Sequence, residues 1–188
     1  MTRRAVAATC VAASARGVKK CILLQSNRIT MANYLATINW QRDTNQNKQD
    51  FTNNKYSRAH QWHFDGGVSV PASYSPHVVP LPYSVEQNVD PEEALVASLS
   101  SCHMLFFLSI AAKRKYIVDS YIDEAIGTMG KNEHGKMAFT EVVLHPQIVF
   151  IGEKQPTQEQ VDKIHHMAHE QCFIANSVNF EVRVETIL

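Results

Sequence analysis

Cysteine is scarce in this chain of 188 residues, which contains four. Four cysteines allow three disulfide pairings, but a chain of this length can build a hydrophobic core without a disulfide framework. Cys10 and Cys21 lie near the N-terminus, whereas Cys102 and Cys172 lie 70 residues apart within two predicted helices. This usage indicates a reducing compartment, and we expect a cytoplasmic protein whose later cysteines serve packing or chemistry.

Acidic side chains are absent from the first 42 positions. Six of the 18 Lys and Arg residues precede Met31, which leaves 12 basic against 18 acidic side chains in residues 31–188, a net charge of about −6. A negative body argues against nucleic acid as a partner. No apolar run approaches the ~20 residues that cross a bilayer, so we expect no membrane partner either.

The first thirty residues differ in composition from the rest. Residues 1–30 combine Arg, Ser and Ala without acids, as a transit peptide does, and they also contain a weak signal-peptide pattern. The segment MANYLATINW, which begins at Met31, is typical of the start of a folded domain. We expect a disordered or dispensable extension over 1–30 and one domain over 31–188. A targeting segment and an ordered N-terminal element are the alternatives.

The first part of that domain has the pattern of short strands and loops. Alternating residues 34–40 predict a strand, and polar residues 41–55 predict a loop. Residues 56–72 predict two strands around a turn at 65–67. Residues 73–90 hold three prolines and no clear period, which indicates a long irregular loop of the kind that forms a lid or the wall of a site.

A long helix is predicted next. Asp90 is its N-cap, Pro91 occupies the first helical position and Glu93 completes a capping box. The apolar pattern continues to about Lys115 and covers nearly the whole circumference of the helix. We expect this long central helix to be buried between a sheet and another element.

The remaining residues predict further strands and a second helix. Residues 121–153 are typical of an antiparallel hairpin, in which Pro146 marks a bulge or an edge. A T-x-x-Q box at Thr157 starts the second helix, and residues 179–187 alternate as a closing strand. The apolar stripe of this helix consists of Val161, Ile164, Ala168 and Cys172. The order predicts an α+β fold with antiparallel sheets and two helices gathered on one sheet face.

Cys102 and Cys172 allow three interpretations. Both could be packing residues, because free cysteine is among the most buried residue types. His165, His169 and Cys172 are spaced i, i+4, i+7 on one helical face, which is compatible with a metal site that takes a fourth ligand from elsewhere. The third interpretation is thiol redox chemistry, which requires a reactive thiolate and a second thiol near it.

Redox chemistry at Cys102 would require a cation. The residue lies too far along its helix to benefit from the helix dipole, and burial raises the pKa of a thiol. Arginine is the suitable cation because it stays charged when it is desolvated. The sequence must therefore supply an arginine near Cys102.

The segments DPEEALVASLSSC (90–102) and HEQCFIANSV (169–178) resemble the OsmC/Ohr family of thiol-dependent peroxidases. Family members carry an N-P-E-x-L-x-A-A-x-x-x-C-like helix and a later C-P-[IV]-like segment, and the resemblance covers about Met31 to Leu188. This chain departs from the pattern at three positions. Asp90 replaces the commoner Asn, His103 replaces an apolar residue, and Phe173 replaces Pro, which leaves the subfamily and the substrate open.

The resemblance implies an OsmC-like fold, an intertwined homodimer and a peroxidase that needs no cofactor. Cys102 would attack a hydroperoxide, and Cys172 would close a disulfide that an external dithiol or a lipoylated protein reduces. In the family, the arginine usually lies some forty residues before the first cysteine. Arg58, 44 residues before Cys102, is therefore the best candidate, and Arg42 is the weaker one. Arg58 would lower the pKa of that thiol, and Glu92 would orient the guanidinium.

Glu92 and Cys102 lie ten residues apart in one helix, and therefore ~15 Å apart. Either Arg58 bridges this distance or Glu92 comes from a second chain, and we expect a homodimer with composite sites. Apolar residues 105–107 and the loop 74–83 would favour organic hydroperoxides, unless they are simply core. His77 and His103 are further candidates to line the site, and the alternatives are a non-catalytic OsmC-like stress or binding protein and the metal-binding domain.

Overall fold

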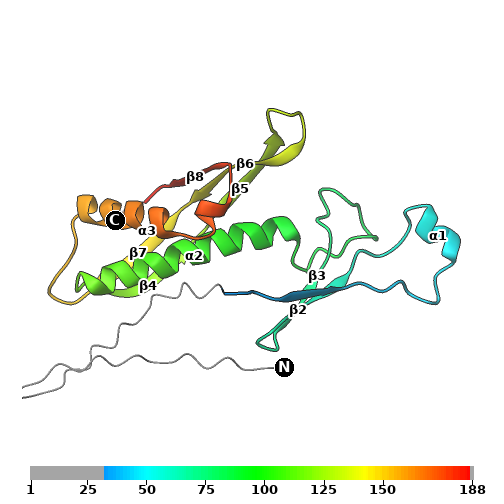
Figure 1. The fold of residues 1–188 in the computed structure, drawn as a ribbon, viewed down its shortest axis with the longest axis horizontal. Coiled ribbons are helices and arrows are strands. Elements are labelled where there is room, and N and C mark those ends of the chain that lie inside the picture. The colour runs from blue at the N-terminus through cyan, green and yellow to red at the C-terminus, as the bar shows by residue number, and fades with distance from the viewer. Residues whose placement is uncertain (1–31, 187–188) are drawn as a thin grey trace, which may run out of the picture. The chain divides into compact units, whose positions relative to one another are not determined.

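The computed structural model describes residues 32–186, so the predicted extension over 1–30 lies outside the described residues. From Leu35 onwards, the described residues form one compact unit. Its first sheet has the antiparallel order β1-β2-β3 (Figure 1). The strands are β1 (Ala36–Asn39), β2 (His60–Phe64) and β3 (Ser69–Ala72). The predicted strand and hairpin are confirmed, and the turn between β2 and β3 contains Gly67 with a φ of 86°, a conformation that favours glycine.

The segment predicted as a loop over 41–55 contains a short helix, α1 (Lys48–Thr52). The side chain of Asn47 caps it by accepting a hydrogen bond from the backbone of Gln49. Phe51 of this helix contacts the rings of Trp40 and Tyr56, with centroids 5.8 Å and 4.6 Å away. An apolar contact therefore stabilises a helical turn in a segment whose polar composition had predicted none.

The long helix α2 spans Pro91–Lys113 and begins with the predicted capping box. The backbone N–H of Glu93 donates to Asp90 Oδ1 at 2.7 Å, and the backbone N–H of Asp90 donates to Glu93 Oε2 at 3.4 Å. Lys115, with a φ of 65°, lies just past the last turn. The sequence thus placed both ends of this helix within two residues.

One side of α2 is buried, and the opposite side is open in the single chain. The buried residues are Leu99, His103, Phe107, Ile110 and Ala111, whereas Leu105 is 63% exposed. The expectation of a helix covered all round therefore holds for one side only. By length and composition α2 could also cross a membrane, contrary to the sequence-based expectation. It packs, however, along α3 (Gln158–Gln171) and β4 (Ile117–Asp123), as the core helix of a globular domain does.

Residues 121–153 form parts of two sheets rather than the single predicted hairpin. β4 pairs with β7 (Pro146–Ile151), and β5 (Ile126–Lys131) pairs with β6 (Met137–Leu144), both antiparallel. Pro146 begins β7, where a missing N–H costs no ladder hydrogen bond. β8 (Glu181–Val184) then pairs in parallel with β6. The sequence pattern predicted neither the strand β4, which begins before the expected hairpin, nor the break between β6 and β7 at His145.

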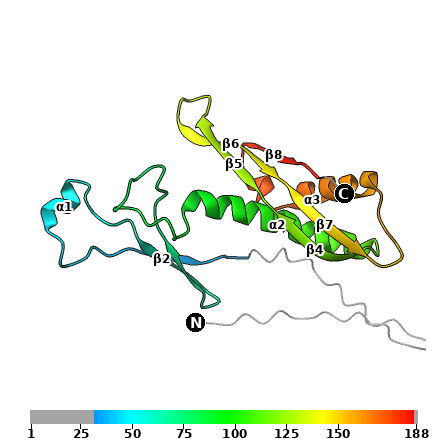
Figure 2. The ribbon, with the colours of Figure 1, turned by 180° about the vertical axis from the view of Figure 1, so that it is seen from behind.

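α3 begins with the predicted capping box at Thr157, and its residues Val161, Ile164 and Ala168 are buried. Its apolar side packs against α2 in one core cluster around Phe107. A second cluster of Leu99, Val142, Leu144 and Cys172 lies between α2, β6 and the end of α3. Figures 1 and 2 show α2 and α3 together on the strands β4 to β8, which confirms the α+β fold.

Candidate functional site

Cys102 and Cys172 are brought together by the packing of α2 and α3. Both are free thiols, and Cys102 packs against the buried cluster that contains Cys172. The two thiols are also close enough that Cys102 influences the pKa of Cys172. Cys172 is fully buried at the end of α3, whereas Cys102 is half-buried. Two cysteines 70 residues apart in the sequence thus form one dithiol site, with the more accessible sulfur on α2.

Burial raises the pKa of the Cys172 thiol to about 11, and the neighbouring Cys102 thiol adds to the effect. The backbone N–H of Ala175 opposes it by donating to Cys172 Sγ at 3.4 Å. Cys172 is therefore protonated at neutral pH, and it would need an electrophilic partner sulfur to react.

Arg58 lies in an aromatic pocket of about 420 Å³ at the first sheet. Its Nη1 donates to the carbonyl of Asn54 at 2.9 Å, and its Cζ lies 3.7 Å from the centre of the Tyr56 ring. Among residues 32–186, no carboxylate forms an ion pair with Arg58. Arg42, the weaker candidate, donates to the carbonyls of Asp43 and Gln46 in its own loop.

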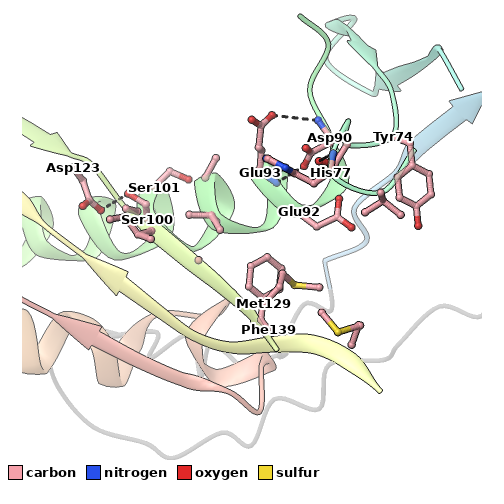
Figure 3. Close-up of a pocket in the computed structure, with 18 of the residues that line it drawn as sticks. Tyr74, His77, Asp90, Glu92, Glu93, Ser100, Ser101, Asp123, Met129 and Phe139 are labelled. Carbon is pink, nitrogen blue, oxygen red and sulfur yellow. Dashed lines mark hydrogen bonds between the residues drawn. The ribbon is translucent and has the colours of Figure 1, made fainter. Parts of the chain in front are cut away.

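Glu92 lies in the first turn of α2 and lines a larger pocket of about 1200 Å³. In Figure 3 its side chain projects into this pocket, between Tyr74 and Met129. Its Oε2 is buried and has no hydrogen-bond partner within the described part of the chain. A buried carboxylate oxygen without a partner is costly, so this position is suited to a cation that the single chain does not supply.

The four predicted site residues therefore fall into two groups. Cys102 and Cys172 contact each other, whereas Arg58 and Glu92 line two pockets that share Tyr74. No hydrogen bond or ion pair links the second group to the first in the described residues. Within residues 32–186, then, no guanidinium is hydrogen-bonded to either thiol.

The two histidine candidates differ in their position. His77 lines the larger pocket, which neither cysteine lines. His103 is instead buried against α3, where its Nε2 lies 2.9 Å from Nδ1 of His165. This contact occupies one nitrogen of the His165 ring. Within residues 32–186, no three His, Cys, Asp or Glu side chains gather as metal ligands, so the metal-binding interpretation of His165, His169 and Cys172 is not supported.

Sequence reasoning missed two contributors to these sites. The Arg58 guanidinium stacks on the ring of Tyr56. The presence of an aromatic residue two positions before the arginine could have indicated this contact. Asp123 of β4 accepts a hydrogen bond from Ser100 Oγ of α2 at 2.5 Å (Figure 3). It also accepts one from the backbone N–H of His145 at 2.7 Å, so it links α2, β4 and the junction between β6 and β7. No local pattern predicts such a contact, because its partners are distant in sequence.

Comparison with known proteins shows which family this chain is similar to. A family model described as OsmC-like protein matches residues 85–187. The structure of an OsmC-like protein of unknown function from Vibrio cholerae is 59% identical, with a TM-score of 0.80, and the alignment covers 84% of this chain and 100% of that one. No curated protein matches the sequence.

More distant solved structures have the same fold. An organic hydroperoxide resistance protein from Elizabethkingia anophelis is 19% identical, with a TM-score of 0.61 and coverage of 85% of this chain and 99% of that one. One from Bacillus subtilis is 17% identical, with a TM-score of 0.57 and coverage of 83% and 98%. With the thiol pair, the family model and the near relative in agreement, the chain belongs to the OsmC-like family.

Proposed function

We propose that this protein is a thiol-dependent peroxidase that reduces organic hydroperoxides in oxidative-stress defence. The observation that carries the proposal is the contact between Cys102 and Cys172, because the reaction requires two thiols within bonding reach. The organic hydroperoxide resistance proteins among the structural relatives support the same reaction class.

In the proposed reaction, the Cys102 thiolate attacks one peroxide oxygen and breaks the O–O bond. Cys102 becomes a sulfenic acid, and the released alkoxide takes up a proton to leave as an alcohol. The Cys172 thiol then attacks the sulfenic sulfur, which forms the disulfide and releases water. An external dithiol, either a small molecule or a lipoyl group on a protein, returns both cysteines to thiols and is itself oxidised to a disulfide. No cofactor takes part.

Arg58 and Glu92 have proposed roles that require a second chain. Arg58 would stabilise the Cys102 thiolate and the developing alkoxide, and Glu92 would hold the guanidinium in place. Arg58 without a carboxylate, the unpartnered Glu92 oxygen and the open apolar side of α2 support a homodimer. We propose that Arg58 and Glu92 of one chain complete the site at Cys102 of the other.

Two experiments test the proposal. Cys102→Ser should abolish consumption of cumene hydroperoxide, and one equivalent of oxidant should give a Cys102–Cys172 disulfide in the wild type by mass spectrometry. For the composite site, Cys102→Ser chains are refolded together with Arg58→Ala chains. Mixed dimers should regain activity at one of their two sites, since one chain supplies the arginine and the other the cysteine. A mixture as inactive as its components would place the whole site within one chain.

A second candidate is a non-catalytic OsmC-like stress or binding protein. The observation in its favour is the environment of the thiols, since no cation contacts either sulfur within residues 32–186 and burial raises the pKa of Cys172. In this case, alkylation of Cys102 at pH 7 would be no faster than that of a free thiol. A faster rate would favour the peroxidase.

A further inference from the structure

Two buried histidines link the helices that carry the thiols. His103 of α2 is 1% exposed and His165 of α3 is 4% exposed. His103 Nε2 and His165 Nδ1 lie 2.9 Å apart, and the ring planes are parallel to within 6°. The ring centroids lie 5.2 Å apart, nearly as far as that hydrogen bond allows, so the bond lies in the plane of both rings. This is the geometry of a well-aligned, directional hydrogen bond.

Both imidazoles are neutral at physiological pH. Burial, with a second contribution from the nearby His169, lowers the pKa of His103 to about 4. Burial lowers the pKa of His165 to about 3, with a second contribution from His103. One ring therefore donates and the other accepts, without a net charge in the interface.

The side chains packed around the two histidines are mainly apolar, so a polar pair is unusual at this place in the interface between α2 and α3. The Phe107 ring lies 4.4 Å from that of His165, and α2 packs on α3 mainly through apolar side chains. Replacing two hydrogen-bonded buried groups by apolar ones of similar shape is often neutral for stability. A hydrogen bond fixes the relative orientation of the two packed helices, whereas apolar contacts tolerate small rotations and shifts.

Each histidine shares a rigid helix with one of the thiols. Cys102 immediately precedes His103, and successive helical side chains point about 100° apart, so the rotation of α2 that satisfies His103 also fixes the direction of Cys102. His165 lies on α3, and Cys172 is the C-cap residue of the same helix. The pair therefore constrains both partners of the dithiol site.

We propose that the hydrogen bond between His103 and His165 positions Cys102 against Cys172 for disulfide formation. The two histidines are positioning residues, since neither is placed to touch the substrate. The role in turnover rests on the proposed peroxidase function, but the alignment of the thiols can be measured without peroxide. A misplacement of about 1 Å at reacting atoms can cost 10- to 100-fold in rate, so loss of the bond should slow disulfide closure by such a factor.

The test uses the full chain with Cys10→Ser and Cys21→Ser, so that two thiols remain. Diamide takes two electrons and two protons from Cys102 and Cys172, which leaves their disulfide and a hydrazine. The rate of closure is followed by quenched alkylation and mass spectrometry. The double variant His103→Leu with His165→Leu removes the bond without leaving a buried polar group unpaired, so that its stability should stay close to that of the wild type. His103→Gln retains a donor and should recover part of the rate.

Tyr116→Phe is the matched control. The Tyr116 hydroxyl donates to Gln160 Oε1 at 2.9 Å, which links the segment that follows α2 to α3 at the end far from Cys172. We expect the disulfide to form slowly in the double leucine variant and at the normal rate in Tyr116→Phe. The melting temperature of the double leucine variant should be unchanged. Normal closure in the double variant, or equal slowing in the control, overturns the proposal, as does a wild type that forms no such disulfide. Peroxide consumption by the wild type is assayed separately, and its absence would count against the peroxidase function alone.

Discussion

The guanidinium of Arg58 lies on the face of the Tyr56 ring, with Cζ 3.7 Å from the ring centre. A hydrogen bond to the Asn54 carbonyl holds one edge of the fork, and Asn54 adopts the left-handed conformation with a φ of 62°. The segment between β1 and β2 thus holds the Arg58 guanidinium in a fixed orientation. Because no carboxylate forms an ion pair with it in residues 32–186, the charge remains available to a partner or a ligand.

These contacts of Arg58 predict that Arg58→Lys is not a conservative change. Lysine keeps the charge but loses the planar fork that stacks on Tyr56 and can hold two oxygens at once. We expect kcat/KM for cumene hydroperoxide to fall by roughly 100-fold, the effect of losing one oxyanion donor, with little change in stability. Arg42→Lys is the control, because Arg42 bonds only to carbonyls in its own loop. Equal losses in the two variants would contradict the assignment of Arg58.

A second prediction concerns the resolving step. Cys172→Ala, made with Cys10→Ser and Cys21→Ser, should still allow one attack of Cys102 on a hydroperoxide, but no second thiol would remain in the chain to react with the sulfenic acid. We therefore expect a single turnover, followed by accumulation of the sulfinic form of Cys102 at excess peroxide, detected as a mass increase of two oxygens. Continued turnover by this variant with an external dithiol would show that Cys172 is dispensable.

Gly127 of β5 makes a third prediction possible. A Cβ at this position would lie 2.5 Å from Phe139 Cε1 and 2.6 Å from Val96 Cγ2, where α2 crosses the strand. Gly127→Ala should lower the free energy of unfolding by about 1–3 kcal/mol, the usual cost of overpacking. Gly66→Ala is the control, because a Cβ there meets nothing within 4 Å. Urea denaturation of both variants measures the difference, and a fully stable Gly127→Ala would mean that α2 can move away from β5.

The buried histidines predict a dependence of stability on pH. Their folded pKa values, about 4 for His103 and about 3 for His165, lie below the ordinary value of 6.5. The unfolded chain therefore binds more protons below pH 6.5, and stability is lost as the pH falls from there through the folded values. The loss at pH 4 should be on the order of 3 kcal/mol per imidazole.

The measurement compares urea unfolding at pH 7 and pH 4 with that of the double variant His103→Leu with His165→Leu. Carboxylates contribute to acid destabilisation in both proteins, so the difference between them isolates the imidazoles. The double variant should be the less acid-sensitive of the two. Equal acid sensitivity would mean that the histidines are accessible to protons in the folded state.

Local signals in the sequence were sufficient for the helices and for the general fold. Asp90 and Thr157 carry capping boxes that form as expected, and the turn at 65–67 closes a hairpin. The strand β4 and the separation of β7 from β6 were missed, because sheet pairing depends on contacts between distant segments. The helix α1 was missed because its stability comes from the packing of Phe51.

The candidate site was predictable only in part. The contact between Cys102 and Cys172 followed from family resemblance, since spacing alone left packing and metal binding open. The partner of His103 could not be foreseen, because its sequence neighbours give no sign of a bond to His165. The roles of Arg58 and Glu92 stay predictions, and the distance along α2 explains why one chain is not expected to complete the site.

The composition of α2 has a consequence for biosynthesis. This helix is apolar enough to cross a membrane, and most of the strands that cover it follow it in the chain. During synthesis α2 leaves the ribosome before those strands do. Its apolar side therefore stays in contact with water until β4 to β8 have been made.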